Sequence, residues 1–205
     1  MDDSLRAGVA IYNAGAYRAA HGAWEATWLD LEDGSDDERF LHGLIQFTAA
    51  VHHAHEGNHS GATGLAQSAQ QYLDGLAGDY RGINLDDVRA YLARLESDPD
   101  VAVRDDPLEL RLDGDVVTPE ELDFDAIVVA ADVLAEELDG YDESIVADAI
   151  AYAREEVSTG EQTQFTAMVF DFVQNDVQRG LVYQRLAEHV RLKRRREDDV
   201  SGLFE

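Results

Sequence analysis

Two polar side chains that can carry acid–base chemistry stand four residues apart near the start of the chain. His21 and Glu25 lie in a stretch whose aromatic and small residues recur at steps of three and four. This spacing predicts a helix that includes residues 17–28 and places both side chains on one face, with Trp28 one turn further on. An imidazole beside a carboxylate suits general acid–base chemistry, and divalent metals accept both groups as ligands.

A second set of polar residues lies on the next predicted helix, over residues 38–56. His42, Gln46 and His53 are separated by four and seven residues, so they share one face of a helix that is otherwise largely apolar. If the two polar faces oppose each other, these side chains converge between the helices. We therefore expect a ligand pocket there, lined by Tyr17, His21, Trp24, Glu25, Trp28, Gln46 and His53.

Three interpretations of this arrangement stay open. The one that needs the fewest assumptions is a buried hydrogen-bond network, because a histidine inside a helical core requires polar partners. The second is a pocket for a small molecule or a protein segment. The third is a metal-assisted, hydrolase-like enzyme in which His21, Glu25 and His53 are the catalytic residues and bind a divalent metal. No cofactor is predicted under the first two interpretations.

Further histidines cluster at the end of the helix predicted over residues 38–56. The stretch VHHAHEGNH places His52, His53, His55 and His59 around Glu56, and such groups bind zinc or nickel at helix ends. The Gly-Asn pair at residues 57–58 is expected to end this helix and begin the next. We interpret the additional histidines as surface residues with adventitious metal affinity.

The chain is strongly acidic. Its 205 residues include 43 Asp and Glu against 16 Lys and Arg, a formal net charge of -27, and Lys193 is the only lysine. A surface of this charge repels itself in dilute buffer, whereas molar salt shrinks the screening length to about 3 Å and removes most of the repulsion. We therefore expect a halophilic protein of a salt-filled cytoplasm, whose acidity reflects its solvent and says little about its partners.

One basic stretch, VRLKRRRE, interrupts this acidity at residues 190–197. An acidic partner or a nucleic acid would suit the cations of Arg191–Arg196. The simpler interpretation is that cations near a helix C-terminus complement the helix dipole and pair with carboxylates of the same chain. Because high salt weakens phosphate binding steeply, a nucleic-acid partner is not expected.

Several classes of protein are excluded by simple features. The chain has no cysteine, so disulfides and thiolate chemistry are absent. Its start has two acids and no basic segment before the first apolar residues, which is unlike a secretory signal. No apolar run approaches the roughly 20 residues that cross a bilayer. We expect a cytoplasmic protein without a membrane partner.

The hydrophobic pattern predicts an all-α fold, a helical bundle of about nine helices. The exception is the segment around Asp113-Gly114, which predicts one small β-hairpin near residues 108–117. Apolar stripes after Phe124 need a partner, either the core or a second copy, so a homodimer through this part is an open alternative. The predicted organisation is a helical core at 1–100, a loop and hairpin connector at 101–122, a helical extension packed on the core at 123–196, and a loose tail at 197–205.

Three stretches resemble the family called domain of unknown function 309. They are YNAGAYRAAHGAWEATW (Tyr12–Trp28), FLHGLIQFTAAVHH (Phe40–His53) and EGNHSGATGL (Glu56–Leu65), in the order and spacing of that family, and the resemblance covers about residues 5–97. It implies a compact helical fold but no activity. The positions that match the family pattern are His21, Glu25, Trp28, Gly43, Gln46, His53, Gly57, Asn58, Gly61 and Ala62.

The sequence thus favours a non-enzymatic binding module with a polar pocket between helices, for a protein or small-molecule partner that the sequence does not identify. The alternative is the metal-assisted enzyme that uses His21, Glu25 and His53.

Overall fold

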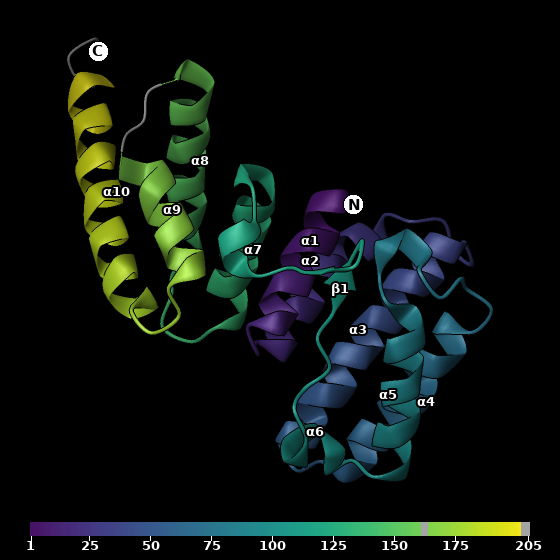
Figure 1. Cartoon of the computed structure of the whole chain (residues 1–205). Coiled ribbons are helices and arrows are strands. Elements are labelled where there is room, and N and C mark those ends of the chain that lie inside the picture. Colours follow the sequence, from purple (N-terminus) through teal and green to yellow (C-terminus); the bar gives the residue numbers. More distant parts are fainter. Residues whose placement is uncertain (161–163, 202–205) are drawn as a thin grey trace. The chain divides into compact units, whose positions relative to one another are not determined.

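The chain is almost entirely helical, as the sequence predicts. The structure is a computed structural model, which describes residues 1–160 and 164–201 (Figure 1). These residues form α1 (Asp2–Asn13), α2 (Tyr17–Leu29), α3 (Asp36–His55), α4 (His59–Leu73), α5 (Leu85–Ser97), α6 (Val101–Arg104), β1 (Arg111–Leu112), β2 (Asp115–Val116), α7 (Phe124–Glu137), α8 (Glu143–Thr159), α9 (Gln164–Gln174) and α10 (Arg179–Ser201), with short 3₁₀ turns at Tyr80–Gly82 and Pro119–Glu121.

The chain divides into two compact units, residues 1–122 and 123–205. The segment expected to be a connector, 101–122, belongs to the first unit, and its hairpin turns at Asp113-Gly114 as predicted. Helix α10 continues to Ser201, into the stretch expected to be a loose tail, and residues 202–205 lie outside the described part. The predicted packing of the extension on the core stays a prediction.

The N-terminal caps of the first unit follow the local sequence. The Ser35 side chain accepts a hydrogen bond from the backbone N–H of Glu38 at 3.1 Å, which begins α3. Asn58 does the same for α4 through the backbone N–H of Gly61, also at 3.1 Å. Both side chains satisfy a donor that the first helical turn would otherwise leave without a partner. These caps fix where the helices that hold the polar residues begin.

Helix α1 is joined to α2 by a close contact between a glycine and a tryptophan. Trp24 is fully buried, and its indole N–H donates to the backbone carbonyl of Leu5 at 3.4 Å. A β-carbon added to Gly8 would lie 2.2 Å from the indole nitrogen. Only glycine allows α1 to approach the ring this closely, so the register between the two helices depends on this pair of residues.

The hairpin is held to the helices of the first unit by two asparagines. The Asn13 side-chain amide donates to the carbonyls of Leu110 and Val117, each at 2.9 Å, and its oxygen accepts from the N–H of Leu110 at 2.9 Å. The Asn84 oxygen accepts from the N–H of Arg111 at 2.9 Å. These bonds satisfy backbone groups that a two-stranded ribbon cannot pair by itself.

The second unit contains helices α7 to α10, and a buried carboxylate connects two of them. Glu156 of α8 is 5% exposed. It accepts hydrogen bonds from the backbone N–H of Phe165 at 3.2 Å and from the backbone N–H and hydroxyl of Thr166, both at 2.9 Å. A carboxylate on the first turn of α9 satisfies free donors and complements the positive end of the helix dipole.

Among the described residues, no helix combines the length and the apolar character that crossing a membrane requires.

The contact between Gly8 and Trp24 leads to a stability prediction with a matched control. Gly8→Ala should lower the free energy of unfolding by about 2 kcal/mol, because the new methyl group overlaps the indole ring. Gly64→Ala, at a position of α4 with open space around a β-carbon, should raise it by about 1 kcal/mol through helix propensity alone. Urea denaturation measures both, and equal effects of the two substitutions would contradict the close contact.

The second unit provides a similar comparison between neighbouring glutamates. Glu156→Ala should destabilise this unit by about 2–3 kcal/mol, because it leaves buried donors at the start of α9 without partners. Glu155→Ala removes only an exposed pair with Lys193, at 3.0 Å, and should cost less than about 1 kcal/mol. Calorimetry on the full chain distinguishes these results, and a small effect at Glu156 would show that its hydrogen bonds are dispensable.

Candidate functional site

His21 and Glu25, which the sequence predicts to share a helix face, form a pair on the surface of α2. His21 Nε2 lies 3.5 Å from Glu25 Oε2, and the two side chains are 35% and 50% exposed. The four-residue spacing on a helix is sufficient to bring them together. Solvent reaches both groups, so this contact is a surface pair and does not form part of a buried network.

The two ends of the α2–α3 pair are marked by ring contacts. Tyr17 stacks on His55 with ring centroids 4.9 Å apart, and Trp28 contacts His42 at 4.5 Å. The start of α2 therefore lies beside the end of α3, and the two helices are antiparallel. This arrangement places Glu25 near the level of Gln46. Because a helix rises about 1.5 Å per residue, His42 and His53 are about 16 Å apart along α3.

The polar residues that the structure brings together are Trp28, Glu38, His42 and Tyr72, which we call the His42 cluster. The Trp28 indole N–H donates to Glu38 Oε1 at 2.8 Å, and His42 Nδ1 lies 3.3 Å from the same oxygen. The His42 ring stacks on Tyr72 with centroids 3.8 Å apart, on helix α4. Three helices thus contribute to one half-buried site.

A glycine makes the stack between His42 and Tyr72 geometrically feasible. A β-carbon added to Gly43 would lie 2.5 Å from a methyl carbon of Leu73 and 3.4 Å from the β-carbon of Tyr72. The missing side chain lets α4 approach α3 at this level. Tyr72 therefore reaches the imidazole because the residue next to His42 is a glycine.

The burial of the cluster determines what His42 can do. Its side chain is 18% exposed and that of Glu38 is 15% exposed. The carboxylate at Nδ1 favours the tautomer with a proton on that nitrogen. No hydrogen-bond partner of Nε2 is found in the part of the chain that the structure describes. In the neutral imidazole Nε2 is then an acceptor, held in place by the rings of Trp28 and Tyr72.

The remaining predicted pocket residues have separate surroundings. Trp24 is fully buried against Gly8 and offers no surface to a ligand. His53 Nδ1 lies 2.9 Å from the side-chain amide of Asn58, the cap of α4. Gln46 is half-buried one turn from His42. Burial raises the pKa of Tyr17, which packs on the ring of Tyr12 at 5.2 Å.

The histidines near the end of α3 do not converge. The stretch His55-Glu56-Gly57-Asn58-His59 has the letters of the zinc-protease pattern His-Glu-x-x-His, which requires one continuous helix. Here Gly57 has a positive φ of 72° and α3 has ended before it. His55 stacks on Tyr17, whereas His59 lies 3.1 Å from Asp100.

The described residues contain no group of three or more His, Asp or Glu side chains that could hold a metal ion, and His21, Glu25 and His53 form no such group. Burial lowers the pKa of His52, which keeps its imidazole neutral over a wider pH range.

One pair of the His42 cluster could have been predicted from the sequence. Glu38 and His42 are four residues apart, the same spacing as His21 and Glu25. Tyr72 lies thirty residues from His42 and has no local pattern that connects the two.

Two comparisons with known proteins bear on this part of the chain. Residues 5–65 match the family model described as "Domain of unknown function (DUF309)", which confirms the resemblance over those residues. An uncharacterized protein of Aquifex aeolicus (strain VF5) is 31% identical over 81 residues, which are 40% of this chain. The chain spans only 24% of the length of that relative. The matched residues 5–65 include Trp28, Glu38 and His42, and Tyr72 lies outside them.

The hydrogen bond between Trp28 and Glu38 should be measurable as a coupling energy. Trp28→Phe and Glu38→Ala, made singly and together, form a double-mutant cycle with an expected coupling of about 1 kcal/mol, because the indole N–H donates to a half-buried carboxylate. The same cycle with Trp28→Phe and Glu25→Ala is the control and should give no coupling. Additive effects of Trp28→Phe and Glu38→Ala would contradict the observed geometry.

Proposed function

We propose that the first unit is a non-enzymatic binding module and that the His42 cluster is its ligand site. The observation that carries this proposal is the state of the His42 imidazole. One nitrogen lies against Glu38, the ring contacts the aromatic rings of Trp28 and Tyr72, and the other nitrogen has no hydrogen-bond partner among the described residues. A polar group fixed in this way loses little entropy when a ligand binds.

The chemistry of the cluster indicates the kind of group that it would accept. A neutral Nε2 accepts a hydrogen bond, so the ligand should present an N–H or O–H donor. Trp28 and Tyr72 are both half-buried and offer apolar ring surface next to the imidazole, which favours a planar group. Gln46, one turn further along α3, can donate and accept through its amide. A small planar amide or amine, free or on a protein side chain, combines these properties.

The choice of a binding module over a hydrolase rests on the residues around this site. A hydrolase needs a nucleophile or a metal-bound water placed near a general base. The described side chains that hydrogen-bond to His42 or make ring contacts with it are Trp28, Glu38 and Tyr72. A glutamate and two aromatic rings support recognition of a ligand more directly than they support hydrolysis.

The chain contains two tryptophans, Trp24 and Trp28, so the signal of one can serve as a control for the other. We would record proton–nitrogen spectra of the full chain while adding small planar amides, amines, guanidines and carboxylates in turn. We expect an amide or amine to shift the indole N–H signal of Trp28, which lies in the cluster. The signal of Trp24 should stay in place because that ring is fully buried.

Two variants make this titration decisive. His42→Ala should abolish the shift of Trp28, whereas His189→Ala, on α10 of the second unit, should leave it unchanged. If no class of compound moves the Trp28 signal, or if the shift survives in His42→Ala, the proposed site is wrong.

A further inference from the structure

Helix α10 has two faces with different surroundings. Val182, Leu186 and Val190 are buried on the face that packs within the second unit. The opposite face turns to solvent, and we call it the outer strip. It consists of Leu181, Gln184, Glu188, Arg191, Leu192 and Arg195. Leu181 and Leu192 are 47% and 43% exposed. These two side chains leave aliphatic surface in contact with solvent on this face of α10.

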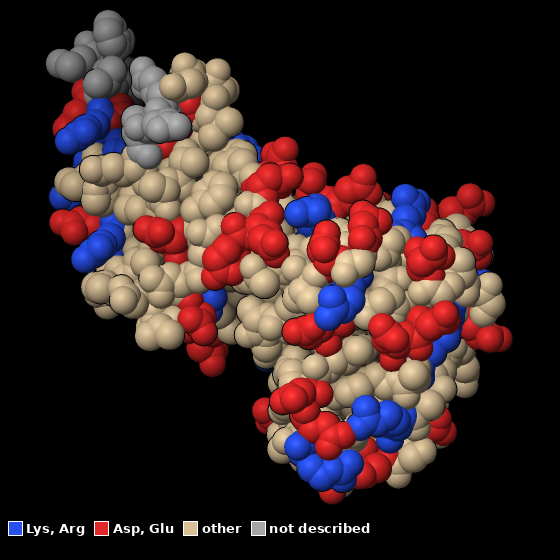
Figure 2. Space-filling view, in the orientation of Figure 1, with Lys and Arg blue, Asp and Glu red and all other residues tan. Residues whose placement is uncertain are grey.

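The positive charges of the outer strip are unusual for this chain. In the first unit, every arginine from Arg39 to Arg111 contacts a carboxylate, and Figure 2 shows basic groups there lying among acidic ones. On α10, Lys193 and Arg194 contact Glu155 and Asp148 of α8. Four others are exposed and have no ion pair within the described residues: Arg185, Arg191, Arg195 and Arg196.

The prediction that the cations near the end of α10 pair with carboxylates of the same chain therefore holds for only two of them. Lys193 and Arg194 pair within the chain, as expected for cations near the end of a helix. Among the described residues, Arg191 and Arg195 have no such partner, although the chain contains 43 acidic residues. Because exposed ion pairs contribute little stability, the lack of a carboxylate costs the fold little and leaves both charges available to a partner.

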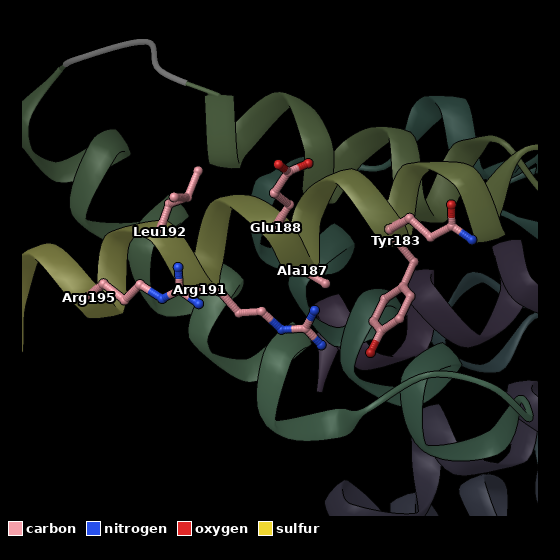
Figure 3. Close-up of a pocket in the computed structure, with 7 residues that line it drawn as sticks. Tyr183, Ala187, Glu188, Arg191, Leu192 and Arg195 are labelled. Atoms are coloured by element: carbon pink, nitrogen blue, oxygen red, sulfur yellow. The ribbon is translucent and has the colours of Figure 1, made fainter.

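The shape of the outer strip adds an independent observation. A hollow of about 460 Å³ lies over Ala187, and in Figure 3 the Arg191 side chain extends past Ala187 toward Tyr183. A helix that packs on another places each side chain into a hole formed by residues i, i+3, i+4 and i+7. The residues around the hollow form two consecutive holes of this kind, made by Gln184, Ala187, Glu188 and Arg191 and by Glu188, Arg191, Leu192 and Arg195.

We propose that the outer strip of α10 binds an acidic α-helix of a partner protein. The two consecutive holes fit side chains from successive turns of a helix. The unpaired arginines require carboxylates on that helix, and Leu192 with Ala187 requires a small or aliphatic residue between them. Glu188 lies between the arginines, so the partner should have no carboxylate opposite this position.

A second copy of this chain fits the strip less well. In an antiparallel pair of α10 helices, Glu188 would meet Arg191 of the other copy. Arg195 would then lie opposite Gln184, and Arg185 would lie opposite Arg194, so neither arginine would gain a carboxylate. Like charges at an interface cost affinity, so charge complementarity favours a partner that is acidic along the whole strip.

The probe for this proposal is a fluorescent peptide of about three heptads with alanine and leucine on one face and glutamate beside it. Its binding to the full chain is followed by anisotropy, alongside a scrambled peptide of the same composition and a lysine version. We expect the acidic helix to bind and both other peptides to bind at least about tenfold more weakly, because shape and charge are both required.

Variants of opposite effect separate recognition from misfolding. Arg191→Glu and Arg195→Glu should each weaken binding about tenfold, whereas Glu188→Lys should strengthen it by removing a like charge. Arg154→Glu, an exposed and unpaired arginine on α8, is the matched control and should change nothing. A destabilised protein would not gain affinity in one variant and lose it in another.

Several outcomes would overturn the proposal. If the scrambled peptide binds as well as the helix, the strip is a basic patch without helix recognition. If a DNA duplex displaces the peptide and binds more tightly, the partner is a nucleic acid. If sedimentation shows a dimer that both Arg191→Glu and Glu188→Lys dissociate, and that the double variant restores, the occupant is a second copy. Absence of binding by the acidic helix at millimolar concentration would also contradict it.

Discussion

Helix α3 is removed from water on most of its circumference, and the first unit is organised around this burial. Its Phe40, Leu41, Leu44 and Phe47 are fully buried, and α2 and α4 both pack against it. Polar side chains on such a helix can occupy only the remaining narrow face, or else they must be paired. His42 lies at the edge of that face, which is why its neighbours come from two other helices.

The close approach of these helices depends on residues without side chains. Gly8 admits the ring of Trp24, and Gly43 admits α4 next to His42. A methyl group at either position would overlap atoms that packing already holds. The His42 cluster is therefore a consequence of close packing as much as of its own hydrogen bonds, and its rings are fixed before any ligand arrives.

Charge is distributed differently in the two units. In the first, the arginines from Arg39 to Arg111 are paired with carboxylates near the surface, and the pairs confer little stability individually. For example, the Arg81 guanidinium donates to Asp37 and holds the pKa of that carboxyl below its usual range. In the second unit, α10 carries Arg185, Arg191, Arg195 and Arg196, for which the described residues provide no ion pair. In an acidic protein, arginines that lack an ion pair say more about where a partner binds than the net charge of -27 does.

The sequence by itself determined the helical class, the turn at Asp113-Gly114 and the cap at Asn58, because each depends on residues a few positions apart. It also identified Trp28, and the helix face that carries His42. Only the tertiary structure decided that Trp24 is buried, that Glu38 receives the indole N–H of Trp28, and that Tyr72 covers the imidazole. The physical reason is that helical periodicity defines which side chains share a face, whereas the packing of several helices together defines what that face meets.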